Sequence, residues 1–370
     1  MKFHIDSKYP QQRKEIYMGK KVLFIAKINE PKEMPSYIQD FIDNGYEVKI
    51  YSISGMFGKR NILVRLKKRI GLDIRNNVRA RKKHLEKKII SIVNTYEPDI
   101  VCVINGMMLN THCAESIREN SFLVAKMIDR ISFFPEYYED GFSKHYDVIY
   151  TYSLDDYKII NSISHNCVFI PAMWEENVYH NDCLERDIDI SFVGKMYPEK
   201  DYGKRYSTFC KLIKDFPNLN IFIGGECAPI RRIKKYIEWK STPLYKRAFN
   251  NKQITMTECN EVYNRTKISI SMERFGTGNS WSSRLINLFA TGSFVLSSDN
   301  SEMLNKYFNN CFVHFSDYED LKEKIVYYLS HEKERSEIAA RAYERVYEVK
   351  RSSINISMTE DIITRVNHRR

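Results

Sequence analysis

Residues 267–299, KISISMERFGTGNSWSSRLINLFATGSFVLSSD, are the stretch from which the fold is most directly deduced. Apolar residues alternate with polar ones over 268–272, which predicts a β-strand. A polar loop containing glycines follows, and apolar residues then recur at the spacing of a short helix that Ser282 or Ser283 can cap. Gly292 predicts the end of this helix, and the apolar residues after it predict a second strand. This order of elements indicates a parallel α/β sheet.

The loop before this helix is a candidate anion-binding site. Ligands of open parallel sheets bind beyond the carboxyl ends of the strands, and the first N–H groups of a helix have no partner within it. Arg284, in the first turn, opposes the helix dipole, which is best understood if its guanidinium reaches a phosphate or carboxylate. The alternative is a surface arginine on an ordinary loop.

The composition is that of a globular protein large enough for two domains. Of the 370 residues, 43% are hydrophobic and 28% are charged, and this length supports two cores of ordinary size. No run of about 18 apolar residues is present, so we expect no transmembrane helix. The polar residues 1–15 lack the apolar centre of a signal peptide. We therefore expect a cytoplasmic protein.

Cysteine and histidine show no pattern typical of a metal site. The eight cysteines are scattered without a CxxC pair, and the nine histidines form neither HxxxH nor HExxH. We therefore predict reduced, buried thiols, no disulfide framework and no metal.

The positive charge is concentrated in one segment. Residues 57–90 contain 13 Lys or Arg against two acidic residues, an excess that equals the net charge of +11 of the whole chain. Apolar residues recur at helical spacing here, which predicts two basic helices broken at Gly71. Such helices often have no more than a solvated basic face. The functional alternatives are an anionic membrane surface or nucleic acid. Because no aromatic residues interleave 58–90, we favour the membrane and expect no nucleic acid.

The rest of the chain reads as two Rossmann-like domains. We predict an amino-terminal domain over 1–172, a linker over 173–187, a second domain over 188–350, and a final helix within 351–370 that packs back on the first domain. No GxGxxG follows the first strand, so an ordinary dinucleotide fingerprint is absent.

The predicted strands of the first domain are 21–26, 47–53, 99–104, 121–128, 146–152 and 166–170, and those of the second are 189–194, 219–224, 253–257, 267–272 and 294–296. The predicted helices outside the basic segment include 36–44, 319–329, 333–347 and 353–370. Two such domains facing a central cleft suit an enzyme with two substrates.

Several of these segments resemble a known family. DISFVGK, KISISME, NSWSSRLINLFATGSFVLSSD and FSDYEDLKEKIVYYLSHEKERSEIAARAYERV are similar to the carboxyl-terminal domain of group-1 glycosyltransferases, in particular the CgeB-like (spore-maturation-type) branch. The resemblance is specific over about 188–347 and weaker over about 97–175. It implies a GT-B fold and transfer of a sugar from a nucleotide-sugar without an essential metal or other cofactor.

The motif R-x-F-E-x-x-A-x-G of that branch carries residue roles with it. Arg284 takes the arginine position and Gly292 the glycine. The glutamate that typically bonds the donor ribose in relatives is Asn287 here, which cannot accept two hydroxyl protons as an anion does. Glu273 stands near the first acidic residue of the wider E-x7-E pattern with a different loop length. Gly194 and Lys195 sit where relatives place a turn near the diphosphate, Arg205 is a candidate second cation, and Thr257 and Glu258 lie where relatives read the base.

Cations and helix N–H groups can stabilise a departing diphosphate without a metal. We therefore predict Arg284 and Lys195 as catalytic residues. The predicted donor-binding residues are Gly194, Arg205, Thr257, Glu258, Asn279, Ser280, Ser282, Ser283 and Asn287.

An inverting transferase also needs a general base near the acceptor hydroxyl. Asp129, at the carboxyl end of a predicted strand, is the first candidate, followed by His112, Glu136 and Glu139. A solvated carboxylate or a satisfied histidine is the ordinary alternative for each. The DxD at Asp187-Ile188-Asp189, a metal signature of the other glycosyltransferase fold, precedes its strand, so we interpret it as strand entry.

The predicted function is a glycosyltransferase of the hexosyl type. It uses a nucleotide-diphosphate sugar, most simply a UDP-sugar, and a glycan or lipid-linked acceptor in surface polysaccharide or glycoconjugate synthesis, with 58–90 docking it on the cytosolic face of a membrane. The alternatives are a nucleotide-sugar epimerase of the same fold, and a non-catalytic basic adaptor for membranes or nucleic acid on a degenerate scaffold.

Overall fold

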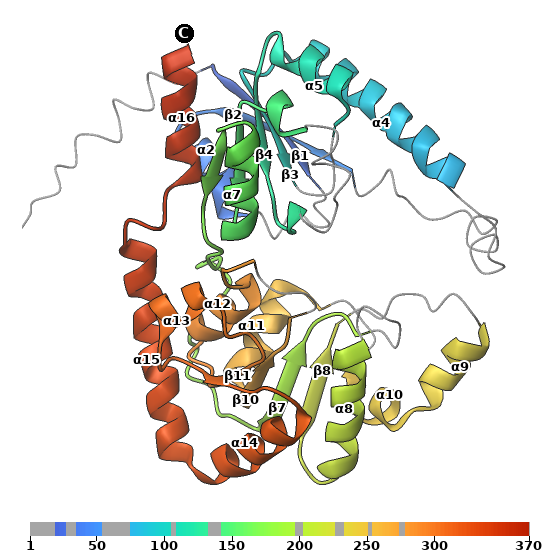
Figure 1. Cartoon of the computed structure of the whole chain (residues 1–370), viewed down its shortest axis with the longest axis vertical. Coiled ribbons are helices and arrows are strands. Elements are labelled where there is room, and N and C mark those ends of the chain that lie inside the picture. Colours follow the sequence, from blue (N-terminus) through green and yellow to red (C-terminus); the bar gives the residue numbers. More distant parts are fainter. Residues whose placement is uncertain are drawn as a thin grey trace, which may run out of the picture. The chain divides into compact units, whose positions relative to one another are not determined.

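The computed structural model of the chain forms two compact units (Figure 1). Unit 1 contains the described residues up to Ile170 together with 356–369, and unit 2 contains Pro171–Asn355. Each unit has a six-stranded parallel sheet with helices on both faces. The structure describes residues 19–26, 35–53, 75–104, 109–131, 142–196, 203–225, 233–250, 254–273 and 278–369.

The sheet of unit 1 has the strand order β2-β1-β3-β4-β5-β6. Its central strands are buried on both faces and therefore read in sequence as continuous apolar runs, as β3 (IVCVI) does. The strands are β1 (Lys21–Ala26), β2 (Glu47–Ser52), β3 (Ile100–Ile104), β4 (Phe122–Lys126), β5 (Val148–Thr151) and β6 (Cys167–Phe169).

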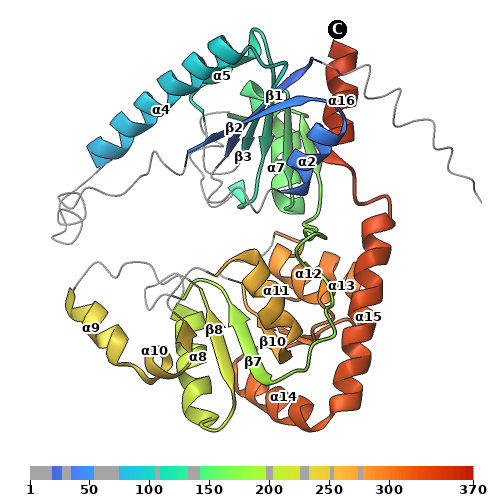
Figure 2. The ribbon, with the colours of Figure 1, turned by 180° about the vertical axis from the view of Figure 1, so that it is seen from behind.

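Helices cover both faces of this sheet (Figures 1 and 2). On one face, α4 (Arg75–Tyr96), α5 (Thr111–Arg118) and α7 (Leu154–Ile163) pack against Leu23 and Val101. On the other, α2 (Ser36–Asp43) and α16 (Met358–Arg369) pack against Phe24 and Cys102. A short 3-10 helix, η2 (Phe142–His145), precedes β5. The carboxyl-terminal helix is thus part of the core of unit 1.

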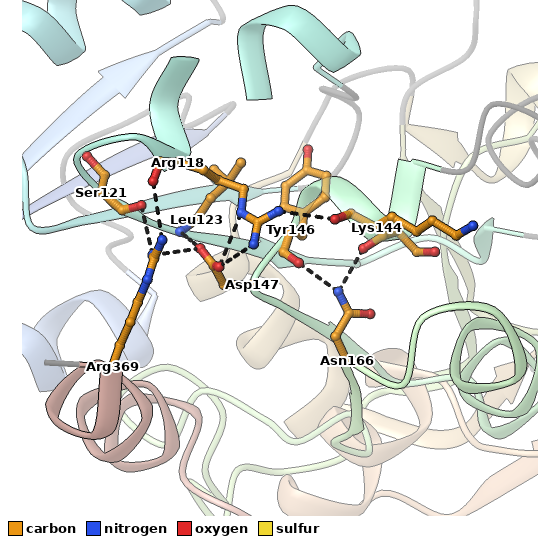
Figure 3. Close-up of polar contacts among 9 residues, drawn as sticks. Arg118, Ser121, Leu123, Lys144, Tyr146, Asp147, Asn166 and Arg369 are labelled. Atoms are coloured by element: carbon orange, nitrogen blue, oxygen red, sulfur yellow. Dashed lines mark hydrogen bonds and ion pairs between the residues drawn. The ribbon is translucent and has the colours of Figure 1, made fainter. Parts of the chain in front are cut away.

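Polar contacts fix both ends of α16. Near its start, Tyr150 donates to Asp361 Oδ2 over 2.6 Å. Near its end, Arg369 donates to Asp147 Oδ2 over 3.2 Å, and the same carboxylate accepts from Arg118 Nη2 at 2.8 Å and from the N–H of Leu123 at 2.7 Å (Figure 3). Asp147 therefore joins α16, α5 and β4.

The sheet of unit 2 has the order β12-β11-β10-β7-β8-β9. Its strands are β7 (Ile188–Val193), β8 (Ile221–Gly224), β9 (Phe249–Asn250), β10 (Thr266–Ser271), β11 (Val295–Ser297) and β12 (Val313–His314). Its helices are α8 (Gly203–Asp215), α9 (Ile233–Ser241), α10 (Pro243–Arg247), α11 (Met256–Asn264), α12 (Ser283–Ala290), α13 (Glu302–Phe308), α14 (Tyr318–Ser330) and α15 (Glu332–Arg351).

The prediction of two parallel α/β sheets is confirmed. One strand prediction is wrong, because the described part of 253–257 leads into α11 instead. Thr255 accepts a hydrogen bond from the N–H of Glu258, and the Glu258 side chain accepts from the N–H of Thr255. This reciprocal pair is a capping box, which starts a helix rather than ending a strand.

Other differences concern helix ends and a thiol. The last helix begins at Met358 rather than at 353, because α15 ends at Arg351 and Ser357 accepts from the N–H of Glu360 in the first turn of α16. Cys183 is exposed, against the expectation of a buried thiol, while the thiol of Cys102 is buried. Of the predicted basic helices, 58–74 with the break at Gly71, and the side chains of 75–83, lie outside the described residues.

Candidate functional site

The central pair of strands in unit 2 marks a switch point. β7 and β10 are neighbours, and strand order runs outward from β7 through β8 and from β10 through β11. Open parallel sheets bind ligands beyond the carboxyl ends of the strands at such a point. Gly194 and Lys195 follow β7 there, and Glu273 follows β10, while α12 starts at Ser283. The structure thus brings several predicted residues to one edge.

Arg284, in the first turn of α12, is held between the ends of these two strands. Its Nε donates to the carbonyl of Val193 over 2.9 Å, and its Nη1 donates to the carbonyl of Met272 over 3.2 Å. Nη1 also pairs with Glu273 Oε1 at 3.0 Å. Nη2 makes no hydrogen bond within the described residues and lies 3.1 Å from where a Cβ on Gly194 would stand. The guanidinium is therefore fixed with one free edge toward the β7 turn.

Glu273 is the partner that the sequence did not predict. Its side chain and that of Arg284 are 20% and 19% exposed, so water screens this ion pair less than it screens a fully exposed one. The positive charge that Arg284 can offer to a diphosphate is correspondingly reduced, because the Glu273 carboxylate already faces the guanidinium. The partial match to the E-x7-E pattern was the only sequence signal for Glu273.

Two glycine turns pack against each other at this edge. The N–H of Gly194 donates to the carbonyl of Gly224 over 2.9 Å. Gly225, with φ +137°, leaves no room for a side chain, since a Cβ there would lie 2.2 Å from the Gly194 carbonyl oxygen. Only glycine combines this conformation with so close an approach. Gly225 was missed by sequence reasoning, although a glycine pair ends the apolar run of β8.

A second arginine lies beside the β7 turn. Arg205, in the first turn of α8, is 4% exposed and donates from Nη1 to the carbonyl of Lys195 over 3.4 Å. The guanidinium carbons of Arg205 and Arg284 lie 5.4 and 5.3 Å from the ring centroid of Phe192, which is buried. The side chain of Lys195 is exposed and forms no ion pair or hydrogen bond with the described residues. The turn after β7 is therefore cationic.

The amino terminus of α12 presents free backbone donors. Ser282 is the N-cap, and its side chain accepts from the N–H of Leu285. The N–H groups of Ser283 and Arg284 have no hydrogen bond in the described part of the chain, so they can bind an anion. The predicted capping by Ser282 is confirmed.

The loop before α12 is held by neighbouring elements. Asn279 Oδ1 accepts from the N–H of Met303 over 3.0 Å, at the start of α13. Ser280 is buried, and its carbonyl accepts from Ser301 Oγ. Trp281 is fully buried and donates from Nε1 to the carbonyl of Ala172 over 2.7 Å. Asn279 and Ser280 therefore support the loop by these contacts.

The remaining predicted donor residues lie on two helices. Asn287 is half-buried one turn after Ser283 on α12. Thr257 is exposed in the first turn of α11, and Glu258 is engaged in the capping box. Their predicted place at a strand end is therefore wrong.

The candidate bases belong to unit 1. Asp129 is exposed beyond the carboxyl end of β4, and Asp156, buried in α7, accepts from the N–H of Ile131 over 2.8 Å. This bond fixes the chain just after Asp129. His112 is exposed on α5. Glu136 and Glu139 lie outside the described residues.

The DxD pair serves the opposite edge of the unit 2 sheet. Asp187 accepts from Arg265 at 2.6 Å, which lowers the pKa of the Asp187 carboxyl, and Asp189 pairs with Lys267 at 2.8 Å. Both acids are therefore paired with cations at the start of β7. Among the residues that the structure describes, no group of three or more His, Cys, Asp or Glu side chains is arranged to hold a metal ion. No described helix has the length and apolar character of a membrane span.

Comparisons with known proteins agree with this architecture. The model of a family described as glycosyl transferase-like matches residues 204–351. No curated protein sequence is significantly similar to this chain.

Solved structures of the GT-B fold superpose on nearly the whole chain. An alpha,alpha-trehalose-phosphate synthase (UDP-forming) from Burkholderia vietnamiensis has a TM-score of 0.65 at 9% identity, covering 96% of this chain and 100% of that one. Sucrose-phosphate synthase from Thermosynechococcus elongatus has 0.62 at 10% identity, covering 95% and 99%. HepE from Anabaena, solved with UDP-glucose, has 0.58 at 9% identity, covering 94% and 99%. The chain has the GT-B fold.

Proposed function

We propose that this chain is a metal-independent glycosyltransferase that moves a sugar from a nucleotide-diphosphate sugar to a glycan or lipid-linked acceptor. One observation carries the proposal. Arg284 is fixed at the switch point of the unit 2 sheet with Nη2 beside Gly194, and two N–H groups at the start of α12 make no hydrogen bond to any described residue. The GT-B fold and the glycosyl transferase-like match over 204–351 support the same chemistry.

Negative charge develops on the leaving diphosphate, at the position proposed to lie beside Arg284 and the first N–H groups of α12. The acceptor oxygen bonds to the anomeric carbon, the bond from that carbon to the β-phosphate oxygen breaks, and the acceptor proton passes to a base. The diphosphate leaves with additional negative charge, which fixed cations and backbone N–H groups stabilise without reorganisation. Arg284 supplies the fixed guanidinium edge, and the exposed ammonium of Lys195 adds countercharge from the β7 turn. Asp129 is our candidate for the base.

We infer a hexosyl donor activated by UDP. Two neighbours in structure support this inference, since the Burkholderia vietnamiensis enzyme is UDP-forming and the Anabaena protein was solved with UDP-glucose. The proposed donor contacts are those predicted from the sequence, Gly194, Arg205, Thr257, Glu258, Asn279, Ser280, Ser282, Ser283 and Asn287. We assign the chain to the CgeB-like branch on its sequence motifs.

The acceptor side is proposed to face the cytosolic surface of an anionic membrane. On the described half of α4, Lys87 and Lys88 are exposed, while Leu85, Ile89 and Val93 pack in the core of unit 1. Because its apolar stripe is already buried, this half of the helix can attract a membrane only by charge. Binding to anionic vesicles should therefore weaken strongly as salt is raised.

The function is tested by product analysis. The full chain is incubated with UDP-glucose, UDP-galactose or UDP-N-acetylglucosamine, each alone and with a bacterial lipid-linked glycan extract, and UDP release and labelled products are measured. A transferase releases UDP and labels the extract only when both are present. Conversion of one UDP-sugar into another without acceptor identifies an epimerase instead. The absence of both products with these donors, together with no binding of UDP, GDP or dTDP, contradicts the proposal.

A further inference from the structure

A cavity lies at the end of the unit 2 sheet opposite to Arg284. It has a volume of about 580 Å³ and lies between one face of α15 and the amino-terminal edge of the sheet. Lys267, in the first half of β10, and Gly292, which precedes β11, line the sheet side. Glu273 and the candidate donor site follow the other end of β10, which spans six residues or about 20 Å. The cavity therefore belongs to a separate site.

Arg335 contributes a buried charge to this cavity. It is 6% exposed, and its Nη1 donates to the carbonyl of Tyr328 in the last turn of α14. Its side chain makes no other hydrogen bond and no ion pair within the described part of the chain. The charges of Glu332 and Asp189 act on it favourably, but a guanidinium has five N–H donors, and a buried charge with few hydrogen bonds is costly. Arg335 lines the cavity.

A second guanidinium adds to this charge. Arg186 donates to the carbonyls of Tyr263, Thr266 and Gly292, so the backbone fixes its position. Burial lowers the pKa of both arginines, and the charge of Arg335 lowers that of Arg186 further, whereas the charges of Glu332 and Asp189 oppose the lowering at Arg335. Two like charges therefore act on each other inside one cavity, an arrangement that an oxyanion relieves.

The rim has a different character. Glu185, Glu332 and Glu344 are exposed around the opening, and the ring of Tyr343 is half-buried beside them. Carboxylates accept hydrogen bonds from hydroxyl groups, and an aromatic ring packs on the apolar face of a sugar. These acids disfavour a ligand with several negative charges. A ligand with one oxyanion and several hydroxyl groups fits better, because the arginines can bind the oxyanion and the acidic rim can accept hydrogen bonds from the hydroxyl groups.

We propose that this cavity binds a monosaccharide-sized molecule that carries one oxyanion, a phosphate or a carboxylate, with the oxyanion on Arg335 and Arg186 and the hydroxyl groups toward the acidic rim. This site is independent of the proposed transferase chemistry. The simpler alternative is that Arg335 only caps the carboxyl end of α14, where a cation also interacts well with the helix dipole.

Calorimetric titration of the full chain distinguishes these readings. The probes are glucose 6-phosphate, glucuronate and glucose. We expect saturable binding of at least one of the two anionic sugars and none of glucose, and the two anionic arms identify the oxyanion as phosphate or carboxylate. Arg335→Gln should weaken this binding at least tenfold. Ala340→Trp, at an exposed position that lines the cavity, should do the same by occupying it while leaving both arginines in place.

Two variants serve as matched controls. Arg341→Gln removes one charge from the exposed face of α15 outside the cavity, and Arg284→Ala removes the candidate donor cation at the other end of the sheet. Both should retain the affinity of the native protein for the anionic sugar. If Arg335→Gln does not fold, Ala340→Trp alone carries the test. The proposal is overturned if neither anionic sugar binds, if glucose binds as tightly, or if binding survives in Ala340→Trp.

Discussion

Arg284 and Glu273 form an ion pair of 3.0 Å at the carboxyl ends of β7 and β10. Two backbone carbonyls hold the same guanidinium, so its direction does not depend on the carboxylate alone. The pair fixes a cation where a diphosphate is proposed to bind, and it also places a negative charge beside that position. Substitutions of Glu273 can separate its effect on the orientation of Arg284 from the effect of its negative charge.

Replacing Glu273 by Gln should tighten the binding of UDP several-fold. The amide oxygen still accepts from Nη1 of Arg284, while the removal of a neighbouring negative charge favours the anionic ligand by roughly 1 kcal/mol. Glu273→Ala also loses the hydrogen-bond acceptor for Arg284, so its affinity for UDP should be lower than that of Glu273→Gln. Calorimetric titration with UDP measures both. Weaker binding in Glu273→Gln than in Glu273→Ala contradicts this division of roles.

Replacing Gly225 by Ala should destabilise unit 2 by about 3 kcal/mol, because the new Cβ meets the Gly194 carbonyl in a backbone conformation that disfavours side chains. All three tryptophans of the chain lie in unit 2, so their fluorescence during urea unfolding reports this unit. Gly19→Ala serves as the control for backbone strain alone, since Gly19 also has a positive φ, of +90°, but has no described atom within 4 Å of the new Cβ and belongs to unit 1. Equal urea midpoints for Gly225→Ala and the native protein would falsify the packing argument.

Replacing Asp147 by Ala should lower the free energy of unfolding of unit 1 by about 2 kcal/mol. The substitution leaves the N–H of Leu123 and the guanidinium groups of Arg118 and Arg369 without their shared acceptor (Figure 3). Hydrogen exchange at the amides of β4 measures the loss directly. Asp155→Ala, which removes an exposed carboxylate 3.6 Å from Arg130, should leave this protection nearly unchanged. Equal protection in both variants counts against a structural role for Asp147.

Unit 2 should lose stability in alkaline solution. Burial, followed by the charge of Glu334, raises the pKa of Tyr328 to about 12, and burial is also the main cause that raises the pKa of Tyr206 to about 12. A phenol with a raised folded-state pKa stabilises the fold fully below about pH 10 and loses this effect as the pH rises toward 12. Tyr328→Phe should reduce the slope of the unfolding free energy against pH, between about pH 10 and 12, by up to about 1.4 kcal/mol per pH unit. Tryptophan fluorescence in urea at pH 9 to 12 gives the slope, and an unchanged slope rejects the assignment.

The fold was predictable where local pattern and burial agree. β1 was predicted at its observed bounds, because a strand buried on both faces reads as one apolar run. The 253–257 segment failed because Ile254 and Met256 alternate like strand residues, while the Thr255-x-x-Glu258 capping box was overlooked. The two-residue strands β9 and β12 are too short to leave a periodic signal.

The candidate site was predictable only in part. Helix capping is local, so Ser282 could be identified from its place before an apolar helix. The partners of Arg284 come from β7 and β10, and only the tertiary fold brings them together. Asn279 likewise faces α13, a contact that spacing in the sequence does not reveal.

The most direct test of a diphosphate site at Arg284 is calorimetric titration of UDP into the native protein, Arg284→Ala and Arg265→Ala. Arg265 is the control, because it pairs with Asp187 at the amino end of the same sheet. We expect Arg284→Ala to bind UDP at least tenfold more weakly, with turnover reduced by more than tenfold, and Arg265→Ala to bind like the native protein. Equal affinity in all three proteins would contradict it.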